Sequence, residues 1–302
     1  MEISILNKYI IFGFDMETDI GSYLKTYKGV KLGTNKIVNI LKRYGIKATF
    51  FFTGEAALHN REKILEVLEE GHEIGCHSLK HETVGDAGFN MPCDNPLLED
   101  ELENRLLKNI GIIKDITNIN PKSFRAPRLW QGQGQIKVLE KLGFKVDASY
   151  SVAAYKKQLI PYNPSEENWL DKGNMKILEI PNFAFMDDEN DYSKYFCKND
   201  QWPLLRLLGA DFVFKYQKFV IEKQSKLTDK CVLLFYLHPW EFEVMPRKFN
   251  YDEGTFYFKS ELSKNCGQNM LEEFDRYVGL CIDDGFNFTT CIDFCDIWSE
   301  NG

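Results

Sequence analysis

Short apolar runs alternate with amphipathic stretches along almost the whole of this sequence. The first run, YIIFGFDM (9–16), predicts one buried strand, and TNKIVNILKRYG (34–45) predicts a helix between an N-terminal Thr and a closing Gly. Strands separated by helices run parallel, because each helix returns the chain to the same end of the sheet. The pattern therefore predicts an α/β fold built on a parallel sheet.

The alternation continues to the C-terminus. Further strands are predicted at 47–54, 72–77, 123–126, 145–150, 174–181, 231–238 and 286–290. Further helices are predicted at 61–71, 97–116, 135–143, 203–224 and 269–285. Seven or eight such units suggest that the sheet closes into one barrel. No Pro/Gly/Ser-rich linker divides residues 1–302, so we expect a single domain.

Two stretches do not fit the alternation. Residues 83–96 and 155–202 are rich in Asn, Asp, Pro and aromatic side chains and are predicted to be long loops. In a parallel barrel the loops after the strands lie over the mouth and shape the substrate site. We expect the longer stretch, 155–202, to be an insertion of this kind.

Charge and cysteine content limit the partners and the compartment. The net charge is −8 and no dense Lys/Arg cluster occurs, which excludes a nucleic-acid interface and disfavours anionic membranes. The N-terminal segment lacks an export signal and no apolar run is long enough to cross a bilayer. The eight cysteines are scattered without a CxxC pair, which indicates free thiols in the cytoplasm. The sequence carries no signal of oligomeric state.

Ionisable residues gather at the predicted C-terminal ends of the strands, where barrel enzymes carry their active sites. They are Asp15 and Glu17 on the first strand, His77 and His81 after the third, Arg125 on a later strand and His238 at the end of CVLLFYLH. Because the strands are parallel, these side chains should meet at one mouth of the barrel.

A divalent metal is expected among these residues. In HSLKH (77–81), two histidines four residues apart on one helical turn can grip one ion. Alternation along the first strand places Asp15 and Glu17 on one face, and Glu17 is expected as the third ligand. Two histidines and one carboxylate leave positions open for water and substrate, as in catalytic sites. Solvated loop histidines and a solvated acidic turn are the alternatives.

The remaining polar residues suggest a hydrolytic mechanism. Asp15 is expected to take a proton from the metal-activated water, and His238 to return one to the leaving amine. Arg125 is expected to pair with Asp15 and hold it ionised. Asp147 is expected either to tune His238 or to cap a helix. Three side chains are expected to line the substrate pocket: Arg128, Trp130 and Trp240.

Five segments in order resemble motifs of the polysaccharide deacetylases of carbohydrate esterase family 4: FDMETD, HSLKH, FRAPR, VDASY and LHPWE. The resemblance extends from residue 9 to about residue 290. It implies a distorted (β/α)7 barrel, one divalent metal ion (usually zinc) and hydrolysis of N-acetyl groups on amino sugars. It also implies the roles given above: Asp15 as the base, His77 and His81 as metal ligands, Arg125 as the residue that orients the base, and His238 as the acid.

The sequence departs from the family pattern at two positions. Met16 stands where the family carries a second, metal-binding aspartate, so the ligand role of Glu17 is inferred from its place one residue later. Arg128 stands where many members carry an aromatic residue, and its charge suits a phosphate or carboxylate on the substrate. His59 and His72 are expected to lie outside the site.

Three functions follow as hypotheses. The first is metal-dependent removal of an N-acyl group from an amino sugar, with a cytoplasmic nucleotide- or lipid-linked glycan precursor as the expected substrate. The second is hydrolysis of a non-sugar C–N bond, such as a cyclic amide or ureide, which some relatives perform without metal. The third is a non-catalytic carbohydrate-binding barrel; retention of the histidine pair, the base and the acid favours catalysis.

Overall fold

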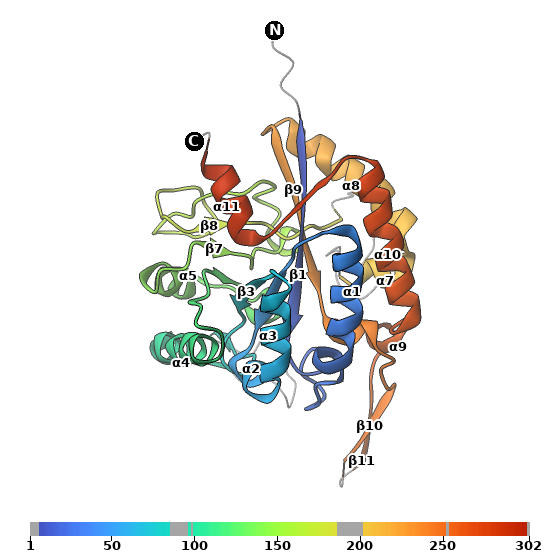
Figure 1. The fold of residues 1–302 in the computed structure, drawn as a ribbon. Helices are drawn as coiled ribbons and strands as arrows, with labels where there is room; N and C mark the ends of the chain where they lie inside the picture. The colour runs from blue at the N-terminus through green and yellow to red at the C-terminus, as the bar shows by residue number, and fades with distance from the viewer. Residues whose placement is uncertain (1–5, 85–95, 98, 186–201, 252–253, 301–302) are drawn as a thin grey trace.

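A computed structural model describes residues 6–84, 96–97, 99–185, 202–251 and 254–300. Within them, parallel strands surround a common interior and most helices lie outside (Figure 1). The barrel strands are β1 (Asn7–Met16), β2 (Thr49–Phe52), β3 (Glu73–Cys76), β6 (Ser123–Phe124), β7 (Val146–Asp147), β8 (Leu178–Glu179) and β9 (Lys230–Leu237). They pair in the order β9-β1-β2-β3-β6-β7-β8, which is the expected parallel arrangement.

The barrel closes between β8 and β9 through a single parallel bridge. Asn182, three residues after β8, pairs with Leu234 of β9, and the Phe183 N–H donates to the Leu234 carbonyl at 2.8 Å. Strand β12 (Asn287–Thr289) pairs with residues 9–11 of β1, and β2 pairs with residues 13–16. Short strands and one closing bridge give the distorted (β/α)7 barrel that the sequence resemblance implied.

Helices and short turns complete the described chain. The helices are α1 (Thr34–Tyr44), α2 (Gly54–His59), α3 (Arg61–Glu69), α4 (Glu99–Thr117), α5 (Gln133–Lys141), α6 (Val152–Tyr155), α7 (Leu204–Leu208), α8 (Ala210–Ser225), α9 (Ser260–Ser263), α10 (Gln268–Asp283) and α11 (Cys291–Ser299). Single turns are η1 (Gly29–Gly33), η2 (Pro127–Leu129) and η4 (Pro239–Phe242). Two further pairs of strands lie outside the barrel sheet: β4 (Thr83–Val84) with β5 (Pro96–Leu97), and β10 (Lys248–Tyr251) with β11 (Gly254–Tyr257). None of the helices in the described part of the chain has the length and apolar character needed to span a bilayer.

Local sequence signals explain most element boundaries and several differences from the predictions. The single helix predicted at 203–224 is two helices, α7 and α8, because Gly209 lies between them with φ 87°. The predictions missed α2 and α11. Each is short and follows an N-cap threonine, Thr53 or Thr290, and the Thr53 side chain accepts from the Ala56 N–H. The β10–β11 hairpin, which projects from the barrel in Figure 1, was also missed.

The two predicted long loops are only partly described. Residues 85–95 and 186–201 lie outside the described chain, so that part of each prediction is untested. In the described part of 155–202, Tyr162, Trp169 and Met175 are buried and pack in the same apolar cluster as Leu106 of α4. This part therefore contributes to the barrel wall, which is more structure than a loop prediction implied.

Burial of His72 makes stability depend on pH. The ring packs against Phe50 with centroids 5.2 Å apart, and its Nδ1 accepts from the Ala48 N–H at 3.3 Å. Burial, together with the charge of Lys47, lowers the pKa of His72 from 6.5 to about 4. Between these two values the unfolded chain binds more protons than the folded chain, so stability falls as the pH falls through that window.

We expect His72→Gln to flatten this pH dependence. In the parent chain His72 should remove up to about 3 kcal/mol of unfolding free energy between pH 6.5 and 4. Urea unfolding at several pH values measures it, with His59→Gln as an exposed histidine control. Parallel pH profiles for His72→Gln and the parent chain would contradict this assignment.

Candidate metal centre

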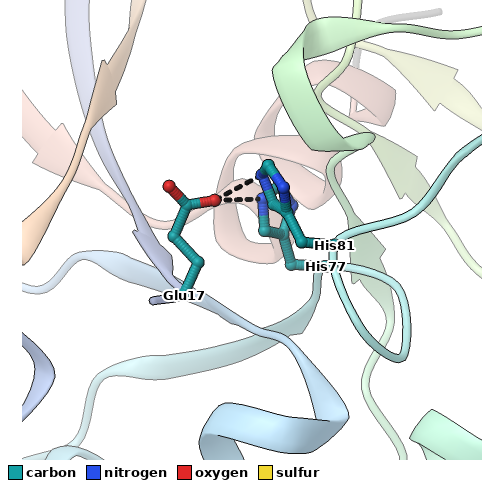
Figure 2. Close-up of side chains that lie close together, drawn as sticks. All are labelled: Glu17, His77 and His81. Carbon is teal, nitrogen blue, oxygen red and sulfur yellow. Dashed lines mark ion pairs between the residues drawn. The ribbon is translucent and has the colours of Figure 1, made fainter. Parts of the chain in front are cut away.

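Three ligand-bearing side chains meet at the C-terminal ends of β1 and β3. Glu17 directly follows β1, His77 directly follows β3 and His81 comes four residues later. One atom of each lies within 4.8 Å of the others, and all three residues are buried. Glu17 Oε2 is 3.5 Å from His77 Nε2 and also pairs with His81 Nε2 (Figure 2). The structure thus brings together the three residues expected to hold a metal.

The segment that carries the histidines is not the helical turn that the sequence suggested. Ser78 and His81 both have φ 61°, in the left-handed region, so the chain turns back on itself between the two histidines. The imidazole centroids still lie 5.1 Å apart. The prediction of convergence was correct, but the helical geometry behind it was wrong.

The backbone fixes the protonation of His77. Its Nδ1 lies 2.7 Å from the carbonyl oxygen of Arg125, and a carbonyl can only accept a hydrogen bond. Nδ1 must therefore carry a proton, and Nε2 is the ring nitrogen directed at Glu17. This arrangement is typical of metal-binding histidines, whose second ring nitrogen is held by a carbonyl or carboxylate.

The donor atoms fit a cation. Both oxygens of Glu17 and the Nε2 atoms of His77 and His81 are buried, and among the described residues none of them has a hydrogen-bond partner outside this group. Burial alone would raise the pKa of Glu17, but His81 and His77 hold it well below its usual value. Burial lowers the pKa of His81, which favours its neutral form. An ionised carboxylate and two neutral imidazoles are the protonation states that metal binding requires.

Arg125 crosses the barrel interior and fixes Asp15. Its Nη1 lies 2.9 Å from Asp15 Oδ1, while Nη2 reaches Asn182 Oδ1 at 3.2 Å and the Phe235 carbonyl at 3.1 Å. Its Nε donates to the Ala148 carbonyl at 3.2 Å. Both charged residues are fully buried. The other oxygen, Asp15 Oδ2, is 3.3 Å from His77 Nε2 and so faces the metal centre.

The guanidinium needs a glycine in the neighbouring strand. A Cβ atom on Gly13 would lie 2.5 Å from Arg125 Nη2 and 2.8 Å from its Cζ, which real side chains do not permit. Gly13 is on β1 two residues before Asp15, on the same face of the strand. The absence of a side chain at this position provides the space that the arginine occupies.

His238 is held by Glu241, which is itself paired with Arg206. Its Nδ1 lies 3.2 Å from Glu241 Oε1, and Arg206 Nε donates to Glu241 Oε2 at 3.0 Å. His238 Nε2 faces the centre, 3.9 Å from Glu17 Oε1. Burial alone would lower the pKa of His238, but the carboxylates of Glu241 and Glu17 raise it. A histidine that keeps its proton at this position can serve as an acid.

The carboxylate that pairs with His238 belongs to Glu241, and not to Asp147 as the sequence interpretation had allowed. Asp147 accepts from the side chains of Gln131 and Ser149 and contacts Glu179, and it neither pairs with His238 nor caps a helix. Burial raises the pKa of Asp147 to about 6 and that of Glu179 well above its usual value, so the two carboxyls share a proton near neutral pH. A signal for Glu241 was present: a glutamate three residues into a turn can accept from the first backbone N–H, as Glu241 does from His238.

The three expected pocket residues have different surroundings. Arg128 is partly buried, donates to the Gly21 carbonyl at 3.3 Å and lies near enough to lower the pKa of His81. Trp130 is 42% exposed and donates to the Val84 carbonyl, so it lies toward β4. Trp240 is 1% exposed and packs against His238 with ring centroids 5.2 Å apart, so its place in the substrate pocket stays a prediction. Trp202, which the sequence interpretation missed, packs edge-on against His238 at 5.5 Å.

Comparisons of the sequence with known proteins agree with this arrangement. A family model described as polysaccharide deacetylase matches residues 9–146. A peptidoglycan deacetylase of Helicobacter pylori is 27% identical over 175 residues, which are 52% of this chain and 55% of that protein. The chain therefore matches about half the length of this curated relative.

Solved structures share the fold over almost the whole chain. A protein from Mycobacterium smegmatis assigned to the polysaccharide deacetylases superposes with a TM-score of 0.62 at 15% identity, covering 98% of this chain and 91% of that one. The Puue allantoinase gives a TM-score of 0.64 at 15% identity and covers 100% and 93% of the two chains. At this identity the likenesses establish the fold alone.

We expect one divalent ion per purified chain, lost on substitution of a ligand. Elemental analysis after gel filtration should find metal in the parent chain and little in His77→Ala or Glu17→Ala, because two remaining ligands bind weakly. Chelation of the parent chain should lower its melting temperature, since a ligand at 100 times its Kd adds about 2.7 kcal/mol of stability.

His59→Ala is the matched control, because His59 is exposed, packs on Tyr27 and lies outside the centre. It should keep the full metal content. Stoichiometric metal in His77→Ala would refute the assignment of the centre, and retention in Glu17→Ala alone would move the third ligand to another residue.

Proposed function

We propose that this chain, whose residues 9–146 match the polysaccharide deacetylase family model, hydrolyses an N-acyl group on an amino sugar with a divalent metal, most simply Zn²⁺. One observation carries the proposal: the Glu17, His77 and His81 donor atoms converge without hydrogen-bond partners outside this group among the described residues. They do so between a fixed carboxylate, Asp15, and a protonatable imidazole, His238.

The residues divide the proton transfers of amide hydrolysis between them. A divalent metal bound at this centre would polarise the acyl carbonyl and lower the pKa of a water molecule. Asp15 keeps Oδ1 on Arg125 and presents Oδ2 to the centre, where it can accept the proton of the attacking water. His238 presents Nε2 from the opposite side and can donate a proton to the departing amine.

Different charged partners keep the two roles apart. Asp15 is paired with Arg125 at 2.9 Å. His238 is paired with Glu241, which raises its pKa and favours the protonated acid. A carboxylate beside a cation and an imidazole beside an anion are the environments that give a base and an acid at the same pH.

We further propose that the substrate is a cytoplasmic precursor with an anionic group near the acylated nitrogen. Arg128 supports this, because it places a positive charge close to His81 at the mouth, and a guanidinium binds phosphate or carboxylate well. The six described cysteines are free, and five of them are buried, which suits a reducing compartment.

Acetate release distinguishes the substrates. We expect turnover of nucleotide-linked N-acetyl amino sugars to exceed that of neutral chitin oligosaccharides or peptidoglycan, and Arg128→Gln to raise KM for the anionic substrates at least tenfold. Activity on polymer alone would reject the precursor proposal while leaving the deacetylase proposal intact. Full activity on an amide or ureide by the metal-free chain would reject both.

Glu241→Gln should reduce kcat about 10- to 100-fold with little change in KM. General acid catalysis accelerates a reaction about 10²- to 10⁴-fold, and the substitution impairs only the orientation and the charge of the acid, His238. Loss of the carboxylate lowers the pKa of His238, so the alkaline limb of the pH–rate profile should move to lower pH. Glu243→Gln is the control, because Glu243 pairs with Lys28 and Lys36 instead. An unchanged alkaline limb in Glu241→Gln would contradict this role.

A further inference from the structure

The turn that carries the metal histidines is held from outside by helix α4. Ser78 and His81 adopt left-handed backbone conformations, which are unfavourable for residues with a side chain. Such conformations persist only where neighbouring structure fixes them. The contacts that fix this turn therefore also determine where His81 lies relative to His77 and Glu17.

Asn109, in the middle of α4, makes the central contact. Its Nδ2 lies 2.5 Å from the Ser78 carbonyl oxygen, 3.2 Å from the Phe52 carbonyl oxygen and 3.0 Å from Cys76 Sγ. The side chain is fully buried. The NH2 group of an asparagine side chain carries two hydrogens, so it can donate to acceptors on two different segments.

The carbonyl groups of Phe52 and Ser78 also accept backbone hydrogen bonds at the start of the HSLKH turn. The Phe52 carbonyl also accepts from the His77 N–H at 2.9 Å, and the Ser78 carbonyl accepts from the Gly54 N–H at 3.1 Å. A Cβ on Gly54 would lie 3.0 Å from Asn109 Oδ1 and 2.7 Å from Leu79 Cδ1. Glycine at this position lets the helix, the end of β2 and the turn approach one another closely.

The same face of α4 also contacts the end of the turn. Arg105, one helical turn before Asn109, places Nη1 3.7 Å from Glu82 Oε1. Glu82 Oε2 accepts from the Lys80 N–H at 2.6 Å, and Glu82 directly follows His81. Asn109 thus fixes the entry of the turn, and the more exposed Arg105 supports its exit.

We propose that Asn109 is a positioning residue of the metal centre, which holds the HSLKH turn so that His77 and His81 face Glu17. The inference rests on the proposed metal-dependent function. Asn109 touches neither the ion nor the substrate; it acts through the backbone carbonyls of Ser78 and Phe52. Residues that orient metal ligands typically contribute 10- to 100-fold to metal affinity.

The experiment measures metal affinity of the full chain rather than activity. Zn²⁺ dissociation constants are determined by competition with a chromophoric chelator for the parent chain, Asn109→Asp and Asn109→Ala. Asn109→Asp keeps the shape but loses the donors and places an acceptor against two carbonyl oxygens. We expect both substitutions to weaken Zn²⁺ binding about 10- to 100-fold. The absorption spectrum of the Co²⁺-loaded chain should change as well, because it reports ligand geometry.

Leu106→Ala is the matched control for a general loss of stability. Leu106 is buried on the same helix and packs in the apolar cluster with Phe124 and Ile136, and its apolar side chain cannot donate a hydrogen bond to the turn. It should lower the melting temperature while changing the Zn²⁺ dissociation constant less than threefold. Lys108→Ala, on the exposed face of α4, controls for changes that do not perturb packing.

Each outcome separates the two proposals. A parent chain that binds no metal would overturn the proposed function and this inference with it. If the parent chain binds one ion and a folded Asn109 variant binds equally tightly, the metal centre stands and the role of Asn109 is refuted. Equal weakening by Leu106→Ala would also refute it. If Asn109→Ala does not fold, Asn109→Asp decides.

Discussion

Arg125 buries its guanidinium in the barrel interior, where four different segments supply its acceptors. Asp15 comes from β1, Asn182 from the chain that closes the barrel, and two backbone carbonyls come from the segment after β7 and from β9. A buried cation that loses a partner destabilises a protein strongly. The barrel walls are therefore held in register around this one side chain, including the seam that has only a single bridge.

The same arginine links the fold to the chemistry. Its side chain fixes Asp15, while its backbone carbonyl accepts from His77 Nδ1 and so sets the tautomer of a metal ligand. His238 has a separate support, Glu241 and Arg206, on the other side of the centre. Base and acid thus belong to two ionic networks, and Glu17 lies between them, 3.9 Å from His238. This separation gives each group its own charged partner within one small volume.

Much of the architecture was predictable because it follows from periodic local signals. The alternation of strands and helices gave the parallel barrel, and polar residues at strand ends located Asp15, Glu17, His77 and Arg125. What failed depended on contacts between distant segments. The left-handed turn has no local signature at Ser78, since serine is not among the residues enriched at positive φ; histidine is enriched there, but His81 alone does not predict the turn. The role given to Asp147 also failed on such contacts, since its carboxylate is held by Gln131 and Glu179 from other segments, whereas Glu241 could have been found from its place three residues after His238.

The contact between Gly13 and Arg125 also restricts how the chain can diverge. A side chain at position 13 would overlap the volume of the guanidinium, so Arg125 would have to move. Such a movement would disturb the contact of the guanidinium with Asp15 and with the carbonyls that it joins. A change at a position with no polar atom of its own would therefore reach the base of the site through one displaced cation.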